Sequence, residues 1–465
     1  MTDRAPHFAP AGGRSGLRRN CLSALENVAQ ALGTMAPTGT IGVILPLLIG
    51  KSGNATWLLL LVTLVVFILI ALNLTIFASR ISSAGGLGTY ARRGLGPTGG
   101  LMASWCYVAG LTLGAASAAP SAAYYAGVVL AHYSGRTPGL LAGAGLTTLV
   151  VSAAWWIAFR GIKLSSDLML VIEFTSLAVI VAILGVALGH SGAWIDRPQL
   201  RLQGVSPAAV ALAFAFSFMT LGGFESVTTL GEEARAATRI IPRVILGCLV
   251  PLGFLYVAVT YVLVSLGRRH QLALDQLEAP FDTLAGLIRM PALGIASSVG
   301  IALSFFACTL GSLNAAARTL YALARAGLFW PRFGEAHRAN ATPHRAIALL
   351  SLIAIAVSAG LVMARVSLID TINYTAQVSA FGYIGAYALV CLAAPFFLRR
   401  IRRLRPWEGA ASALALLLLG LVLVLSIFPV PAAPWRYLPY LFLAILASGM
   451  GISVAQRRAA PEVGA

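Results

Sequence analysis

The feature that most constrains this chain is a series of long segments without a single Asp, Glu, Lys or Arg. A helix needs about 20 apolar residues to cross a bilayer, and twelve segments come near or exceed that length. They cover residues 27–50, 52–79, 94–135, 137–159, 174–195, 202–224, 244–267, 290–317, 346–364, 371–398, 409–435 and 437–456. The sequence therefore predicts an all-α polytopic membrane protein with twelve transmembrane helices.

The composition agrees with that class. Charged residues make up only 10% of the chain, against roughly 25% in soluble domains, which excludes a soluble globular protein. A net charge of +18 would suggest nucleic-acid binding in a soluble protein. Here the basic surplus lies in short loops, where it faces anionic lipid. We therefore expect the lipid bilayer, and no nucleic acid, as a partner.

The distribution of basic residues predicts the orientation. The segment 94–135 is long enough for one span or two. With one span and a cytoplasmic N-terminus, 24 of the 33 Lys and Arg residues fall on the cytoplasmic side, as the positive-inside rule requires. Two spans would put the Arg399–Arg405 cluster outside. We expect one span, both termini in the cytoplasm, and a multi-pass protein of the cytoplasmic (inner) membrane.

Two clusters of helix-breaking residues stand near the middle of their segments. One runs from Gly33 to Gly42 and includes Pro37, and the other runs from Phe218 to Glu225. Non-helical backbone at that depth is tolerated only where protein or a water-filled cavity satisfies it. Close helix packing is the alternative explanation for the glycines. Interruptions at matching positions of two halves point to a transporter site.

The two clusters open segments one and six, and a repeat of five helices is necessarily inverted in the membrane. The sequence thus predicts a 5+5 inverted repeat plus two peripheral helices. The expected parts are a cytoplasmic tail (1–20), the first repeat (21–195), the second repeat (202–398), two further spans (399–456) and a second cytoplasmic tail (457–465).

Four stretches carry a resemblance to a known family. They are Gly39–Gly42 with Pro46, Ser82–Gly86 with Thr89–Tyr90 and Gly94–Pro97, Gly222–Ser226 with Gly231–Arg235 and Ile241–Arg243, and Asn314–Arg318 with Tyr321–Arg325 and Thr342–Pro343. Together they resemble the amino acid, polyamine and organocation permease family along most of the chain. The resemblance implies the fold of the leucine transporter. It also implies a pocket between broken helices one and six, walled by helices three, eight and ten, and transport of amino acids or amines.

Backbone groups freed by the two breaks are the expected ligands of a zwitterion. Unwinding near Pro37 to Gly42 exposes N–H groups of Thr38, Gly39 and Thr40 at a half-helix N-terminus, which suits a carboxylate. Carbonyls near Met219 to Gly223 suit an ammonium group. Phe218, Met219 and Phe224 are candidates for a gate or side-chain pocket, with plain packing as the alternative. The candidate substrate-binding residues are Pro37, Thr38, Gly39, Thr40, Gly42, Phe218, Met219, Thr220, Gly222, Gly223 and Phe224.

Glu173 and Glu225 are the candidate proton-coupling residues. Glu173 lies ten positions beyond Lys163, hence about 15 Å along a helix from the interface. A carboxylate at that depth is costly and is typical of proton relays, although a permanently neutral, hydrogen-bonded acid also fits. Glu225 is a candidate second titrating site or conformational latch, and a purely structural role is the alternative. Glu232 and Glu233 have three arginines nearby in the sequence, Arg235, Arg239 and Arg243. The sequence is equally consistent with salt bridges to these arginines and with an ordinary solvated loop.

Other polar residues give weaker indications. Ser304, Cys308, Thr309 and Ser312 recur at helical spacing, and Tyr374 is a candidate border of the pocket. The five cysteines, Cys21, Cys106, Cys248, Cys308 and Cys391, have no CxxC spacing and predict neither a disulfide framework nor a metal site.

The sequence favours a secondary active, proton-coupled amino acid transporter working by alternating access. The alternatives are an obligate amino acid or polyamine exchanger of the same fold, or a transporter of another small organic cation or metabolite. We find no metalloprotease, phosphate-loop or nucleophile motif, so no enzyme activity and no cofactor is expected beyond a proton gradient. A monomer and a homodimer are both consistent with the sequence.

Overall fold

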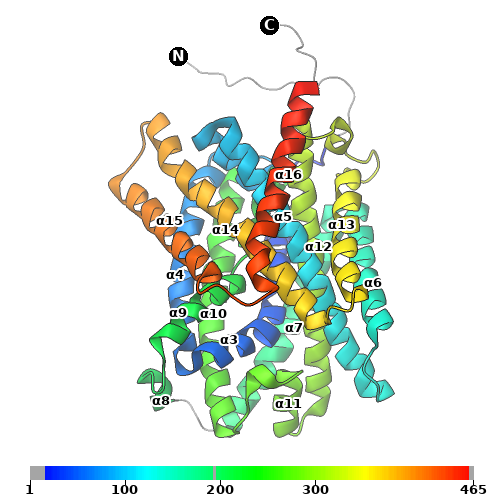
Figure 1. Ribbon diagram of the computed structural model, residues 1–465, viewed down its shortest axis with the longest axis vertical. Coiled ribbons are helices and arrows are strands. Elements are labelled where there is room, and N and C mark those ends of the chain that lie inside the picture. Colours follow the sequence, from blue (N-terminus) through cyan, green and yellow to red (C-terminus); the bar gives the residue numbers. More distant parts are fainter. Residues whose placement is uncertain (1–15, 192–194, 460–465) are drawn as a thin grey trace.

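The computed structural model describes residues 16–191 and 195–459, and this part of the chain is helical throughout (Figure 1). Within those ranges there is no strand, only an isolated parallel bridge between Leu22 and Ala234. Most of the expected tails, residues 1–15 and 460–465, lie outside the described residues. The all-helical class is confirmed.

Among the described residues, eleven helical stretches are long and apolar enough to span a membrane. The first of them, Ala24–Ala78, contains both of the first two expected spans, and each of the others coincides with one further expected span. The long third segment forms one helix, Gly86–Ser134, with a kink at Gly96.

The helices are α1 (Ala24–Met35), α2 (Pro37–Gly39), α3 (Leu45–Ser52), α4 (Thr56–Ala78), α5 (Gly86–Ser134), α6 (Leu140–Arg160), α7 (Ile162–Ser191), α8 (Arg197–Leu200), α9 (Pro207–Ser217), α10 (Ala237–Arg269), α11 (Pro280–Leu287), α12 (Pro291–Arg325), α13 (His344–Met363), α14 (Leu368–Arg400), α15 (Pro406–Ile427) and α16 (Leu438–Ala459). A π-helical turn, η1 (Thr40–Ile44), joins α2 to α3, and two 3₁₀ segments, η3 (Phe218–Thr220) and η4 (Phe224–Leu230), follow α9. Three further 3₁₀ turns, η2 (Gly53–Ala55), η5 (Leu274–Gln276) and η6 (Pro331–Gly334), lie in connections, and η7 (Trp435–Tyr437) precedes α16.

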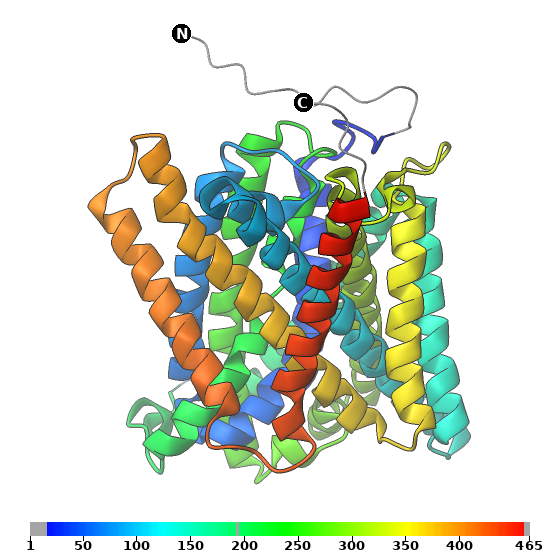
Figure 2. The same cartoon turned by 45° about the horizontal axis from the view of Figure 1, so that its top comes forward.

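The centre of the molecule is built on close contact between α5 and its neighbours α12 and α14. A Cβ atom on Gly382 of α14 would lie 2.7 Å from the Cα atom of Gly110 on α5. Small residues at such a crossing let two backbones approach, which is how membrane helices gain packing energy. In contrast, α15 and α16 bury the smallest shares of their side chains, 22% and 17%, and lie on the outside of the bundle (Figure 2).

The long helices run between two ends of the molecule. The connection between α14 and α15 lies at the upper end in Figure 1, whereas α8 and α11 lie at the lower end. The arginines from Arg399 to Arg405 therefore lie at the upper end, opposite the short α11 helix.

Candidate functional site

The first break separates α1 from α2. Helix α1 ends at Met35, and Ala36 adopts a left-handed conformation with φ 45°. Pro37 then begins α2, a position where its missing N–H costs nothing because the first N–H groups of a helix have no intrahelical partner. The break thus places the N-terminus of a second helix, α2, inside the protein, where Thr38 is completely inaccessible to solvent.

The second break follows α9. The chain passes through η3 and a turn to Gly223, whose φ of 105° favours glycine, and continues as η4. A Cβ atom on Gly223 would lie 2.8 Å from the carbonyl oxygen of Thr34, so the glycine also allows the second break to touch the end of α1. The Ser226 hydroxyl donates to the Gln30 carbonyl, 3.2 Å away. The two breaks are therefore packed against each other.

A cavity of about 150 Å³ lies where the breaks meet. Its walls come from the α1–α3 segment, α5, α9 with η3, α12 and α14. Of the candidate substrate-binding residues, four line this cavity: Thr40, Phe218, Met219 and Gly222. Cys308 and Ser312, two of the polar residues on α12, also line it.

The other candidates lie nearby but outside the lining, namely Pro37, Thr38, Gly39, Gly42, Thr220, Gly223 and Phe224. Gly39 lies against the ring of Phe305, and Gly42 lies against Ile301. Tyr374 contacts the ring of Trp435, with 5.2 Å between centroids, whereas its neighbour Asn373 lines the cavity.

Glu173 of α7 lies at the N-terminus of α2. Its side chain is buried, and the Ser304 hydroxyl of α12 donates to both carboxylate oxygens, at 2.8 and 3.0 Å. The same hydroxyl oxygen accepts the N–H of Gly39 at 3.1 Å, and the Thr38 N–H also interacts with the carboxylate. Glu173 has no cationic partner among the described residues. A protein carboxylate thus faces the partial positive charge of α2.

The N–H groups expected to bind a substrate carboxylate therefore already have partners in this structure. Thr38 faces Glu173, Gly39 donates to Ser304, and the Thr40 N–H donates to the Ala36 carbonyl at 2.8 Å. The Ser304 hydroxyl connects the first break to Glu173, because it accepts from Gly39 and donates to the carboxylate.

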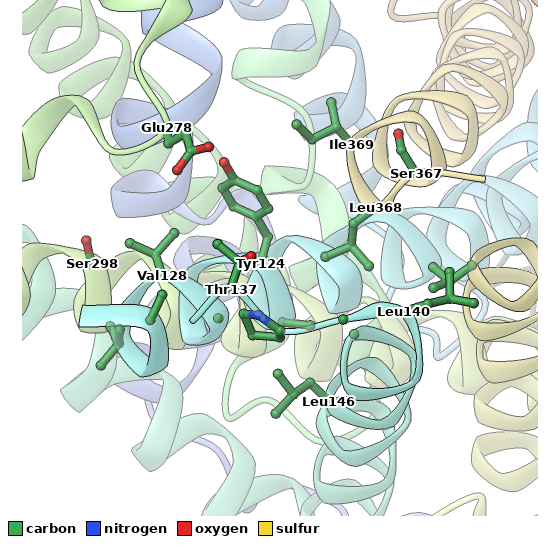
Figure 3. A pocket seen from close by; sticks show the side chains of 18 of the residues that line it. Tyr124, Val128, Thr137, Leu140, Leu146, Glu278, Ser298, Ser367, Leu368 and Ile369 are labelled. Carbon is green, nitrogen blue, oxygen red and sulfur yellow. The ribbon is translucent and has the colours of Figure 1, made fainter. Parts of the chain in front are cut away.

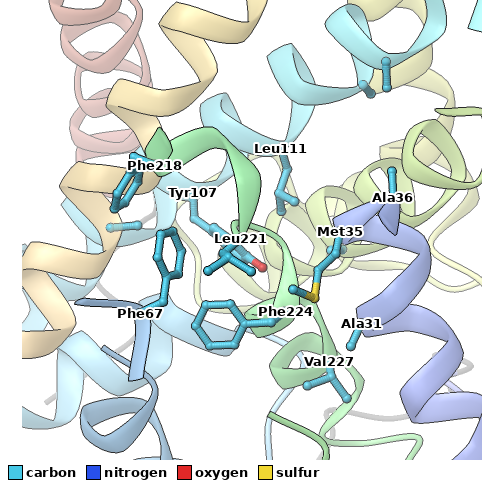
Figure 4. Close-up of a cluster of buried hydrophobic side chains, with 14 of the residues drawn as sticks. Ala31, Met35, Ala36, Phe67, Tyr107, Leu111, Phe218, Leu221, Phe224 and Val227 are labelled. Carbon is cyan, nitrogen blue, oxygen red and sulfur yellow. The ribbon is translucent and has the colours of Figure 1, made fainter. Parts of the chain in front are cut away.

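Glu225 is buried beside the second break. One carboxylate oxygen accepts the Gly223 N–H at 3.0 Å and the Tyr387 hydroxyl at 2.5 Å. Phe224 contacts the rings of Phe67 and Tyr387. Figure 4 shows Met35, Leu221, Phe224 and Val227 filling the space between α1 and the η4 segment. Apolar side chains thus fill the region around the second break, and the Glu225 carboxylate is buried beside them.

Another buried carboxylate, Glu233, follows η4 in the chain and forms an ion pair. Arg318 of α12 and Glu233 are each 1% exposed, and two guanidinium nitrogens donate to the carboxylate at 2.5 and 3.0 Å. Arg318 directly follows the uncharged segment 290–317, and α12 continues past it to Arg325 and buries it. Glu233 pairs with Arg318 rather than with Arg235, Arg239 or Arg243.

The segment before α1 is attached to the same place. The N–H groups of Cys21 and Leu22 both donate to the Glu233 carbonyl, at 2.8 and 3.0 Å, and the Arg235 N–H donates to the Leu22 carbonyl at 2.9 Å. These bonds form the isolated bridge described above. These backbone bonds and the ion pair together join the segment before α1, the residues after η4 and α12.

A larger hollow of about 610 Å³ lies away from both breaks (Figure 3). It is lined by the last turns of α5, the start of α6, and residues of α11 and α14, among them Tyr124, Leu140, Asp282 and Leu368. Within the described part of the chain, no three His, Cys, Asp or Glu side chains are grouped to hold a metal ion.

Comparison with known proteins identifies the family. Residues 27–437 match the amino acid permease family. The chain belongs to this family. An uncharacterized transporter of Mycobacterium tuberculosis is 28% identical over 415 residues, covering 86% of each chain. The methylthioribose transporter of Bacillus subtilis is 24% identical over 293 residues, 60% of this chain and 61% of that one. The vacuolar cationic amino acid transporter 4 of Arabidopsis thaliana is 26% identical over 369 residues, 74% of this chain and 59% of that one.

The family confirms the resemblance seen in the sequence, and it is a family of membrane transporters rather than enzymes. Several residues of this permease were not anticipated, among them Asn373, Tyr383 and Ser117, which line the cavity. Each lies within an uncharged segment. Charge counting gives no signal for such residues, and only the rotation of each helix decides whether they face the cavity.

Proposed function

We propose that this permease is a secondary active transporter that carries amino acids across the cytoplasmic membrane by alternating access, with proton coupling. The observation that carries the proposal is the cavity at the junction of two broken helices. Irregular backbone inside a membrane protein is typical of transporter sites, where half-helix ends and freed carbonyls meet a small polar ligand. Pro37, Thr38, Gly39, Thr40, Gly42, Phe218, Met219, Thr220, Gly222, Gly223 and Phe224 form the proposed substrate region.

Glu173 is the proposed proton carrier. It combines burial, the absence of a cationic partner in the described chain, and a link through Ser304 to Gly39 beside the cavity. A proton arriving at Glu173 removes the negative charge that faces the α2 N-terminus. Because this changes the electrostatics of the first break, protonation and substrate occupancy are linked. Glu225, held by Gly223 and Tyr387, is the proposed second site.

The proposed topology has twelve spans, with α1–α3 as the first and α4 as the second. Spans one to five and six to ten form the inverted repeat, and α15 and α16 are peripheral. The contact between the two breaks and the low burial of α15 and α16 support this arrangement. The arginines at the upper end of Figure 1 support a cytoplasmic location for that end. We propose the same side for both termini.

An obligate exchanger of amino acids or polyamines is the alternative, with Glu173 as a structural acid. Proteoliposomes distinguish the two. We expect an inward proton gradient to drive uptake by the wild type, and Glu173→Gln to lose gradient-driven uptake while keeping exchange of substrate across the membrane. Asp167→Asn, on the exposed surface of the same helix, is the matched control and is expected to keep both.

Three results would count against parts of this proposal. Exchange by the wild type without any gradient-driven net uptake would favour the exchanger. Equal gradient-driven uptake by both would remove Glu173 from coupling. No uptake or exchange of any amino acid or amine would refute the proposed substrate class.

A further inference from the structure

The cavity between the two breaks is lined by uncharged residues alone. No Asp, Glu, Lys, Arg or His is among its lining residues in the described chain. Glu173 and Glu225 lie behind the walls, where Ser304 and Tyr387 hold their carboxylates. A second ammonium group in this cavity, on a diamine or on a lysine or arginine side chain, would be buried without a countercharge. Burial of an unpaired charge is strongly unfavourable.

Most hydroxyl groups of the lining have already donated their hydrogen to a backbone carbonyl. The donor and acceptor pairs are Thr34 to Gln30, Thr40 to Met35, Ser117 to Ile372, Ser121 to Ser117 and Ser379 to Gly110. A hydroxyl oxygen that has donated its hydrogen can still accept. These groups therefore offer acceptors to one substrate ammonium group.

Two side chains of the lining keep free donors. The amide of Asn373 and the hydroxyl of Tyr383, both on α14, make no hydrogen bond within the described structure. An amide presents two N–H donors, and donors of this kind suit a carboxylate. The lining thus offers acceptors for an ammonium group and donors for one carboxylate, without a net charge of its own.

The size of the cavity restricts the side chain of the substrate. A volume of about 150 Å³ lies below the roughly 300–1,000 Å³ of typical small-molecule pockets. That space suits a compact amino acid such as glycine, alanine or serine rather than one with a long or aromatic side chain.

We propose that this permease transports small amino acids of zero net charge, with Asn373 as the specificity-determining residue that binds the substrate carboxylate. The inference rests on the proposed transport function and narrows its substrate class. It separates this chain from its relative that is named a cationic amino acid transporter.

The test is counterflow in proteoliposomes with glycine, alanine, serine, leucine, phenylalanine, arginine, putrescine and methylthioribose as probes. We expect exchange of alanine or serine, and rates at least about tenfold lower for arginine and putrescine. Asn373→Asp places a carboxylate at the same position and is expected to weaken alanine binding by about ten- to a hundredfold, as for a lost hydrogen bond to a charged group. It is also expected to raise the relative rate for putrescine or arginine.

Gln377→Glu is the matched control, since it makes the same chemical change one turn along α14, outside the lining. A size-exclusion profile like that of the wild type shows that a variant is folded, and Asn373→Ser provides a milder second variant. Preference of the wild type for arginine, putrescine, methylthioribose or a large side chain overturns the inference while leaving transport intact. Equal selectivity of Asn373→Asp and Gln377→Glu removes Asn373 from the site. Exchange of no probe at all refutes the proposed function together with the inference.

Discussion

Glu173 and Glu233 are both buried carboxylates, but only Glu233 has a cation beside it. Two nitrogens of Arg318 hold Glu233, whereas Glu173 is held by a hydroxyl group and the N-terminus of a short helix. A buried ion pair keeps both charges because removing either leaves the other unpaired. A buried acid without a cation can become neutral at little structural cost. The comparison teaches that burial alone does not distinguish a structural carboxylate from a proton carrier.

The largest effect is expected from breaking the ion pair. Arg318→Met leaves the Glu233 carboxylate buried and unpaired, which costs about 3–5 kcal/mol of stability. Thermal unfolding of the purified protein in detergent measures this loss. Arg325→Met, on the exposed end of the same helix, is the control and is expected to behave like the wild type. The double variant Glu233→Gln with Arg318→Met is expected to recover part of the loss. Wild-type stability of Arg318→Met would contradict the structural role.

A smaller effect is expected at Glu173. Glutamine keeps the size of the side chain and its acceptor oxygen for Ser304 while removing the charge, so Glu173→Gln should change stability by less than about 1 kcal/mol. The same thermal measurement, beside Glu233→Gln, gives the contrast directly. If Glu173→Gln loses as much stability as Glu233→Gln, the two acids have the same structural role and the comparison fails.

The smallest effect is expected at Asp196, a buried carboxylate with a partly exposed cation. Burial on its own raises the pKa of Asp196, but hydrogen bonds from Arg268 and Gln199 hold the pKa of that carboxyl below its ordinary value of 3.8. A lowered pKa gives stability that is complete above the unfolded value and is lost as the pH falls through the folded value. Because Arg268 is 40% exposed, we expect less than about 1 kcal/mol.

The stability difference between the wild type and Asp196→Asn should therefore be largest near neutral pH and shrink as the pH falls below about 4. Thermal unfolding of both proteins over a pH series measures it. A difference that grows on acidification would contradict the assigned sign.

The sequence predicted the helical membrane class and the family because apolar length and local motifs carry them. Glu173 is buried inside the helix bundle, and its depth in the bilayer, which was inferred from helix rise, stays a prediction. The partner of Glu233 did not follow, since Arg318 lies 85 residues away and stands just beyond the end of an uncharged segment. Asn373 was passed over in favour of Tyr374, because hydropathy does not give the rotation of a helix about its axis. Long-range pairing and helix rotation are tertiary properties that a single sequence leaves open.

The bridge between Leu22 and Ala234 has a consequence for the rate of transport and its dependence on temperature. A movement of Glu233 away from both the segment before α1 and α12 breaks the three backbone hydrogen bonds of this bridge together with the Arg318 ion pair. Because these contacts meet at Glu233, we expect them to break cooperatively and opening at this end to have a high activation enthalpy. Turnover of this permease should therefore rise steeply with temperature, and an antibody fragment that clamps the segment before α1 should slow turnover without altering which substrate is chosen.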